Sequence, residues 1–319
     1  MESIKENLES LVQESVERTV GSLKRPFGLF LSGGVDSGLL AALSKPDVVF
    51  TCKFDYGPQF DEFESAEATA KHLDLEMVVV EPTKEDFEKY LPEALKMFER
   101  TTHFSLVPLY MLFKAAKERG IDTILSGEGP DEYLGGYSAY SILLEEEALI
   151  ERLKKQPELQ NYGPMIDRYF GSLMSRYARM LGKDEMTVQP YWDKYENKVS
   201  KFGYTDLFVR KIEDMELALA KGFGIKLLYP YMTEEIAEFC FQEISDGMKV
   251  DGYTTKVLWK KIAEEYLSDE VVWRRNKMGG PVAPVSHWLG HPDRPFDKGP
   301  YLALQDKIIK AQKDEFAKG

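Results

Sequence analysis

Six consecutive residues near the start of the chain have the composition of a phosphate-binding loop. Residues 32–37 lie between an apolar run and the expected start of a helix near Gly38. In that setting backbone NH groups and the helix dipole can hold an anion. Two glycines allow the backbone to approach a phosphate closely, and two serines add hydroxyl donors. The candidate phosphate ligands are Ser32, Gly33, Gly34, Asp36 and Ser37.

Asp36 gives this loop a requirement that a Walker loop does not have. A Walker loop follows the pattern GxxxxGK[ST], and its lysine is missing here. A carboxylate inside a phosphate loop repels its ligand unless a cation lies between them, so Asp36 predicts a bridging Mg²⁺. The alternative is a plain strand-to-helix turn that needs Gly33 and Gly34 for steric reasons and uses Asp36 and Ser37 as an N-cap.

A second glycine-rich segment, residues 126–137, carries three carboxylates within five positions. It follows an expected strand at 123–125, so we expect it at the same edge of a parallel sheet as the first loop. Carboxylates packed so closely are costly to ionise together unless a cation or a proton balances them. An acidic surface turn is the alternative. The expected roles are Mg²⁺ binding by Asp131 together with Asp36, a position facing the reacting substrate for Glu128, and contact with ATP for Ser126 and Gly127.

The spacing of apolar residues predicts the elements that position these two segments. Strands that alternate with helices, and that are too apolar to face water, predict an α/β fold with an open, mostly parallel sheet and helices on both faces. We expect residues 1–140 to form this nucleotide-binding core. Residues 141–319 are expected to form a mainly helical substrate or lid region of the same continuous domain. Strands are expected at 27–31, 48–54, 77–80 and 123–125, and helices at 4–20, 38–43, 62–73, 84–98 and 106–117.

Length and composition argue against several classes of protein. The chain has 319 residues and a formal net charge of −13, and no apolar run approaches the roughly 18 residues of a membrane span. The negative charge makes nucleic acid an improbable partner, because binding its backbone needs lysine and arginine gathered on one face. Cys52 and Cys240 are the only cysteines and form no CxxC pair. The first residues do not have the pattern of a secretory signal, so we expect a cytoplasmic protein.

Both glycine-rich segments resemble those of known ATP-using enzymes. Residues 32–37 resemble the signature loop of the ATP pyrophosphatases, which cleave ATP between the α- and β-phosphates. Residues 126–137 resemble the SGEGxDExxGGY motif in the synthetase domain of asparagine synthetases, whereas related β-lactam synthetases typically carry tyrosine in place of Glu128. The resemblance extends, with gaps, over about the whole chain. It implies an adenine nucleotide α-hydrolase-like fold and activation of a carboxylate by ATP.

The same resemblance assigns roles to two lysines in the last third of the chain. In the synthetase family, the pattern R-x-K-x-G followed by a proline and a tryptophan carries a lysine that reaches into the active site. Lys277 matches that lysine and is expected to stabilise the transition state as a cation. Lys256 matches a pyrophosphate ligand. The longer pattern is matched by Arg275, Lys277, Gly279, Pro284 and Trp288.

Two departures from the family pattern leave the substrates open. The family's GLEVRxPFLD segment, with a glutamate and an aspartate near the substrate pocket, corresponds to residues 224–233. Lys226 replaces the glutamate and Thr233 the aspartate, so the resemblance leaves open whether the acid is aspartate or another small carboxylate. Met1 and Glu2 lead directly into the region that resembles the synthetase domain, so we expect a stand-alone synthetase domain without the glutaminase domain of glutamine-using relatives. The expected nucleophile is ammonia or an amine, or ammonia from a separate glutaminase subunit.

These observations predict an amide-forming ligase. It adenylates a carboxylate with ATP and Mg²⁺, releases pyrophosphate, and transfers the acyl group to nitrogen with release of AMP. One alternative is a tRNA-modifying ATP pyrophosphatase, which the net charge and the lack of a CxxC pair disfavour. The other is a non-catalytic regulatory homologue, which the presence of Asp36, Asp131 and Lys277 disfavours.

Overall fold

The computed structural model describes residues 2–57, 62–209, 213–274 and 282–316. Its contacts divide the chain into two compact units. Both units take residues from each side of position 140, so the contacts group the chain differently from the expected parts 1–140 and 141–319, and that division stays a prediction. Within the described ranges, no helix is long and apolar enough to cross a membrane. The sheet unit comprises Val16–Gly127, Glu213–Pro230 and Ala263–Gly319, and the helical unit comprises Met1–Ser15, Glu128–Ile212 and Tyr231–Ile262.

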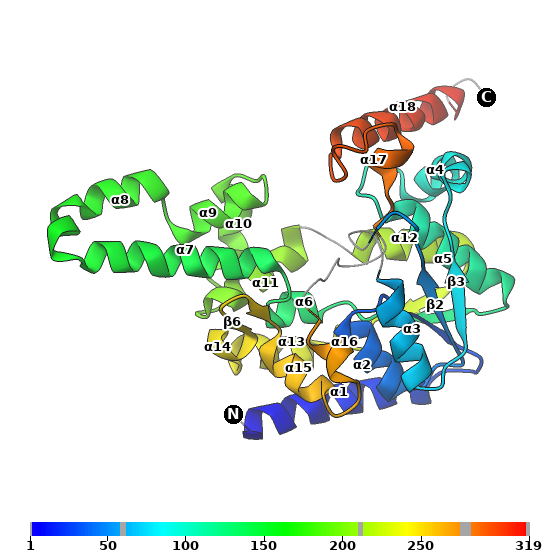
Figure 1. Ribbon diagram of the computed structural model, residues 1–319, viewed down its shortest axis with the longest axis horizontal. Coiled ribbons are helices and arrows are strands. Elements are labelled where there is room, and N and C mark those ends of the chain that lie inside the picture. The colour runs from blue at the N-terminus through cyan, green and yellow to red at the C-terminus, as the bar shows by residue number, and fades with distance from the viewer. Residues whose placement is uncertain (1, 58–61, 210–212, 275–281, 317–319) are drawn as a thin grey trace. The chain divides into compact units, whose positions relative to one another are not determined.

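The sheet unit is built on a parallel sheet with the strand order β3-β2-β1-β4-β5 (Figure 1). The central strands β1 and β2 are buried along their whole length, as their continuous apolar sequences predict. The expected α/β fold with an open parallel sheet is confirmed. The fifth strand lies in residues 224–233 and was not anticipated. The strands are β1 (Gly28–Phe30), β2 (Val48–Cys52), β3 (Met77–Val80), β4 (Thr123–Leu125) and β5 (Lys226–Leu228).

Helices cover both faces of this sheet. The connections from β1 to β2 and from β2 to β3 run through α2 (Val35–Ser44) and α3 (Phe63–His72), and right-handed crossovers put both helices on one face. The return from β3 to β4 puts the next helices on the other face, where the ring of Phe113 contacts Phe30 of β1 and Phe223. The other helices of this unit are α4 (Lys84–Phe98), α5 (Leu106–Glu118), α12 (Glu213–Phe223), α16 (Asp269–Val272), α17 (Val285–Trp288) and α18 (Gly299–Phe316).

The helical unit has its own aromatic core, in which Tyr140, Tyr177 and Phe202 are buried against one another. The backbones of α6 and α11 approach closely at Gly203, where a Cβ atom would lie 1.8 Å from the carbonyl oxygen of Glu132. Helix α1 (Glu2–Gly21) begins in this unit. The other elements are α6 (Pro130–Leu134), α7 (Ser138–Lys155), η1 (Pro157–Tyr162), α8 (Gly163–Phe170), α9 (Leu173–Met180), α10 (Glu185–Trp192), α11 (Lys198–Val209), α13 (Glu234–Gln242), α14 (Asp246–Lys249), β6 (Val250–Asp251), β7 (Thr254–Thr255) and α15 (Val257–Ala263).

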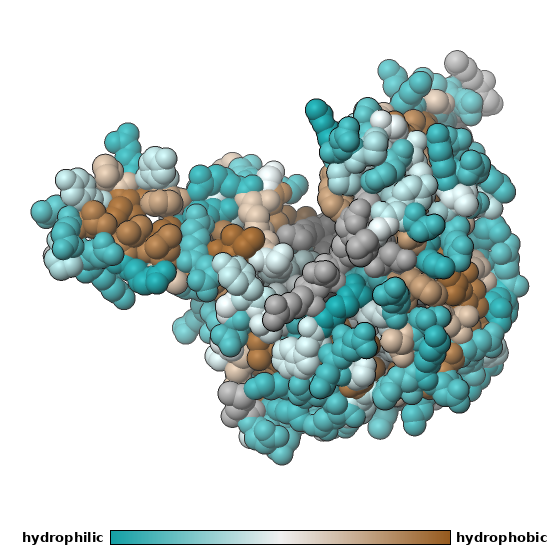
Figure 2. Space-filling model, in the orientation of Figure 1, coloured by the Kyte–Doolittle hydropathy of each residue, from teal (hydrophilic) through white to brown (hydrophobic). Residues whose placement is uncertain are grey.

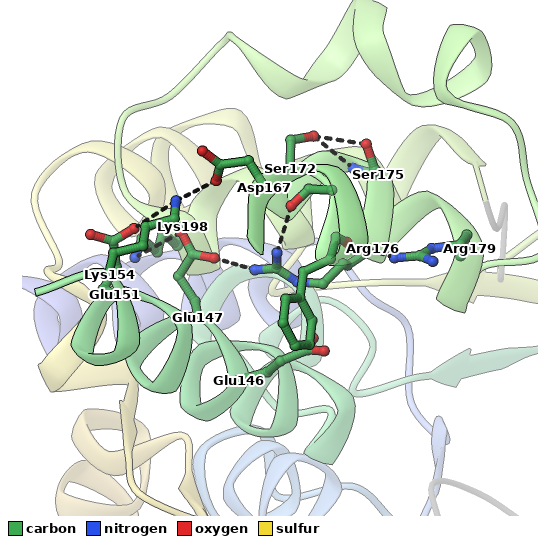
Figure 3. A network of polar contacts seen from close by, with 12 residues as sticks. Glu146, Glu147, Glu151, Lys154, Asp167, Ser172, Ser175, Arg176, Arg179 and Lys198 are labelled. Carbon is green, nitrogen blue, oxygen red and sulfur yellow. Dashed lines mark hydrogen bonds and ion pairs between the residues drawn. The ribbon is translucent and has the colours of Figure 1, made fainter. Parts of the chain in front are cut away.

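Within the helical unit, α7, η1 and α8 form an arm that buried Arg176 of α9 ties together (Figure 3). Its guanidinium Nε lies 3.0 Å from Glu146 of α7, and it also forms an ion pair with Glu147. Lys154 of α7 bridges to Asp167 of α8 at 2.5 Å. The arm also carries exposed apolar side chains, among them Ile142 and Leu149 of α7 and Met165 of α8. Figure 2 shows apolar surface on the part of the molecule that these helices form.

Candidate functional site

The strand order reverses direction between β1 and β4, which makes the carboxyl ends of these two strands a topological switch point. Strand β1 pairs with β2 on one side and with β4 on the other, and all three run parallel. Open α/β sheets bind ligands in the crevice outside the carboxyl ends of the strands at such a point. The two segments singled out by their sequence, 32–37 and the start of 126–137, follow β1 and β4 respectively.

The loop at 32–37 is shaped by hydrogen bonds between its own residues. Gly33 has a φ of +80°, and a Cβ atom there would lie 2.5 Å from the carbonyl oxygen of Glu62, so only glycine fits. The hydroxyl oxygens of Ser32 and Ser37 lie 3.0 Å apart, and the backbone NH of Ser32 donates to Ser37 Oγ at 3.1 Å. The N-cap of α2 is Gly34, which brings no capping side chain. The geometry therefore favours a phosphate loop over a turn capped by Asp36 and Ser37.

Gly127 lies against this loop, as the shared sheet edge predicted, and Ser126 precedes it at the end of β4. The backbone NH of Ser126 donates to the carbonyl of Leu228 in β5 at 3.0 Å, which fixes the end of β4. A Cβ atom on Gly127 would lie 3.1 Å from the backbone nitrogen of Ser37 and 3.2 Å from the carbonyl carbon of Asp36. A side chain at position 127 would crowd the backbone at the start of α2, where an anion would bind.

The rest of the second segment lies in the helical unit, where Asp131 pairs with a lysine. The ammonium of Lys256 lies 2.6 Å from Asp131 Oδ1, and the Lys256 side chain is only 1% exposed. Lys256 has a φ of +54°, a left-handed conformation that costs a non-glycine residue on the order of 1 kcal/mol. Strain at such a residue is typical of positions where function requires an exact geometry. The family resemblance predicted Lys256 as a pyrophosphate ligand, but it did not predict the ion pair with Asp131.

Glu132 is a further buried carboxyl at this site, to which the sequence assigned no role. Burial, followed by the charge of Asp131, raises its pKa to about 7, and Tyr137 donates a hydrogen bond to Glu132 Oε1 at 2.5 Å. The sequence signal that could have pointed to Glu132 was the crowding of three carboxylates within five positions of residues 126–137. The structure balances Asp131 with the Lys256 ammonium, and it favours the protonated form of Glu132 by burying it. Glu128, expected to face the substrate, is half-buried.

Asp36 of the sheet unit and Asp131 of the helical unit each carry carboxylate oxygens, the ligand type that Mg²⁺ prefers, and their joint binding of Mg²⁺ stays a prediction. Both side chains are shielded, with Asp36 at 8% exposure and the Asp131 side chain at 18%. The described part of the chain has no group of three or more His, Cys, Asp or Glu side chains suited to a metal. Mg²⁺ is usually bound by one or two protein carboxylates together with water and phosphate oxygens.

Lys277, together with Arg275 and Gly279, lies outside the described residues. The residues on either side connect to the sheet unit. Arg274 forms an ion pair with Glu62 at 2.6 Å, and the indole NH of Trp288 donates to the hydroxyl of Tyr56 at 3.0 Å. Trp288 therefore anchors α17 to the chain that follows β2.

Residues 224–233 include β5, so part of this segment is sheet. Lys226 is exposed at the amino end of β5, where it pairs with Thr123 of β4. It is thus about 7 Å from Leu228 at the carboxyl end of the strand, which is on the same edge of the sheet as the switch point between β1 and β4. The Thr233 hydroxyl caps α13 by accepting from the backbone NH of Ile236. Lys226, which stands where the family has its pocket glutamate, therefore lies at the amino end of β5.

Comparison with known proteins identifies the family. The family model described as asparagine synthase matches residues 7–297, so the chain belongs to the asparagine synthase family. It is 27% identical over 302 residues to "Asparagine synthetase [glutamine-hydrolyzing] 1" of Bacillus subtilis, covering 83% of this chain and 47% of that protein. It is 26% identical over 151 residues to asparagine synthetase B of Escherichia coli, covering 42% of this chain and 27% of that protein.

The chain spans about half the length of the first of these relatives. Among solved structures it is similar to an NH3-dependent NAD synthetase from Campylobacter jejuni, at 25% identity and a TM-score of 0.27. That match covers 43% of this chain and 60% of the other.

Proposed function

We propose that this chain is an ATP-dependent, amide-forming ligase of the AMP-forming kind. The observation that carries the proposal is the close approach of Gly127 to the backbone of Asp36 and Ser37 at the switch point of the sheet, which leaves no room for a side chain at position 127. Membership of the asparagine synthase family supports the same chemistry. The phosphates of ATP would be held by backbone NH groups and hydroxyls at Ser32, Gly33, Gly34, Ser37, Ser126 and Gly127.

The first step joins the carboxylate to AMP. A carboxylate oxygen attacks the α-phosphorus, the bond from that phosphorus to the bridging oxygen breaks, and pyrophosphate leaves with the electron pair. Asp36 and Asp131 would hold Mg²⁺, which supplies positive charge against the phosphate oxygens. Lys277 would stabilise the charge that develops at the α-phosphorus, and Lys256 would bind the departing pyrophosphate.

The second step forms the amide. The nitrogen of ammonia or an amine attacks the acyl carbon, loses a proton, and displaces AMP. Glu128 is the carboxylate that we place beside the reacting acyl group. The acid is aspartate or another small carboxylate, and ammonia could reach the site as a free molecule or from a separate glutaminase.

Exchange of labelled pyrophosphate into ATP, screened over small carboxylic acids, tests the proposal. Exchange that depends on one acid, with AMP rather than ADP as the product in the presence of ammonia, is the expected result. Asp36→Asn should reduce exchange at least about 100-fold, whereas Asp122→Asn, on an exposed carboxylate, should leave it unchanged. Formation of ADP would overturn the mechanism, and equal exchange in the two variants would remove Asp36 from the site.

A further inference from the structure

The ion pair between Asp131 and Lys256 puts an ammonium on the carboxylate that the proposed function assigns to Mg²⁺. The Lys256 ammonium lies 2.6 Å from Asp131 Oδ1, and Lys256 is almost completely buried. Mg²⁺ binds a carboxylate oxygen at about 2.1 Å, so a metal ion and the ammonium at the same oxygen would repel each other strongly. Asp131 therefore binds a metal ion through this oxygen less readily while Lys256 remains its partner.

The local backbone is built around this pair. A Cβ atom on Gly136 would lie 1.7 Å from Asp131 Oδ1 and 2.2 Å from Lys256 Cε, so the pair packs directly on a glycine. Lys256 follows the short hairpin of β6 and β7, keeps its left-handed backbone, and accepts from the NH of Lys260 at the start of α15. Lys256 is the almost fully buried charge of the pair, and because a buried charge is strongly destabilising when its partner is removed, the Asp131 carboxylate stabilises the ammonium in this position.

We propose that Lys256 serves as an internal cation on Asp131 and gives up this position to Mg²⁺ when ATP binds. The released ammonium then turns to the β- and γ-phosphates. One lysine thus serves first as the partner of Asp131 and then as the ligand of the pyrophosphate group. This lysine-for-metal replacement rests on the proposed function for the role of ATP. It makes Mg²⁺ binding weak without nucleotide and strong with it, because the phosphates provide a second partner for the displaced lysine.

Binding of Mn²⁺, followed by electron paramagnetic resonance in the absence of nucleotide, tests the proposal. Lys256→Met should bind Mn²⁺ roughly tenfold or more tightly than the unmodified protein, because Asp131 then lacks its internal cation. The double variant Lys256→Met, Asp131→Asn should lose this gain. Lys194→Met, which removes the same charge from a weak surface ion pair in the same unit, should bind Mn²⁺ like the unmodified protein.

Circular dichroism should first establish that each variant is folded, and Lys256→Gln replaces Lys256→Met if the latter is not. Mn²⁺ affinity that is unchanged or weaker in the folded lysine variant would overturn the replacement. The readout requires no catalysis, so it is separate from the test of the ligase. A gain in Mn²⁺ affinity without pyrophosphate exchange would support the lysine-for-metal replacement at Asp131 while refuting the adenylation.

Discussion

At the scale of single residues, the site depends on glycines as much as on charged groups. Gly33, Gly127 and Gly136 each stand where a Cβ atom would meet the backbone or the side chains of the site. The sequence indicated the first two through their place in phosphate-binding segments. The steric role of Gly136 depends on Lys256, which is distant in the sequence, and therefore required the structure.

Gly136→Ala should separate Asp131 from Lys256. The added methyl group overlaps both side chains, so at least one of them must move, and the expected cost in the free energy of unfolding is about 3 kcal/mol. Pyrophosphate exchange should fall at least about tenfold. The matched control is Gly247→Ala in α14, where a Cβ atom meets nothing within 4 Å. Chemical denaturation and exchange assays on both variants measure the difference, and equal behaviour would contradict the packing argument.

Lys249 should make the protein more stable at alkaline pH. It is fully buried, its ammonium donates to Ser200 Oγ at 2.7 Å, and burial lowers its pKa from 10.5 to about 8. Between pH 8 and 10.5 the unfolded chain binds more protons at this lysine than the folded chain does, so stability rises with pH in that window. The gain from pH 7.5 to 9.5 is expected to be about 2 kcal/mol.

Urea denaturation at the two pH values measures this effect. Lys249→Met should remove most of the rise, since no titrating group is left at that position, while Lys194→Met should keep it. If the free energy of unfolding still rises with pH in Lys249→Met, groups other than Lys249 cause the pH dependence.

At the scale of elements, the helices and strands before residue 130 were largely predictable. Strands such as β2 are buried on both faces and therefore read as continuous apolar runs, and the helix predicted at 84–98 matches α4. Strand β5 was missed because its residues Lys226–Leu228 are short, only partly buried and include a charge, while pairing with β4 supplies the hydrogen bonds that make it a strand. Such pairing leaves no local signal in the sequence.

The same limit applies to the candidate site. Phosphate-loop residues at 32–37 could be identified because they are contiguous. The partnership of Asp131 with Lys256, and the hydrogen bond from Tyr137 to Glu132, depend on how α6, the loop after it and α15 pack together. The residue types were visible in the sequence, whereas the pairing among them was not.

Arg176 should hold the arm of α7, η1 and α8 together. It is buried and pairs with Glu146 and Glu147, so Arg176→Met leaves two carboxylates without this cation (Figure 3). The loss of a buried partner typically costs about 3 to 5 kcal/mol. Hydrogen exchange should accelerate in α8 and α9 and stay unchanged in the sheet unit. Arg179→Met, which loses only a bond from an exposed arginine to the carbonyl of Phe170, is the control. Equal protection in the two variants would show that the arm is held by its apolar contacts.

At the scale of the whole molecule, charge separates the proposed ligase from a tRNA-modifying enzyme. The chain carries 54 acidic and 41 basic residues, a formal net charge of −13. Nucleic-acid backbones bind through clustered lysines and arginines that release counterions, and a strongly acidic protein repels them at long range.

We therefore expect that adding unfractionated tRNA at low ionic strength leaves acid-dependent pyrophosphate exchange unchanged. Low ionic strength is used because salt screens the interaction between tRNA and the protein. At 0.1 M salt, charges more than about 10 Å apart hardly interact, so attraction and repulsion would both be hidden. Poly-glutamate at equal charge concentration controls for sequestration of Mg²⁺. Exchange that appears only with tRNA, and without a carboxylic acid, would replace the amide-forming ligase by a base-modifying enzyme, since the phosphate loop at the switch point would serve either reaction.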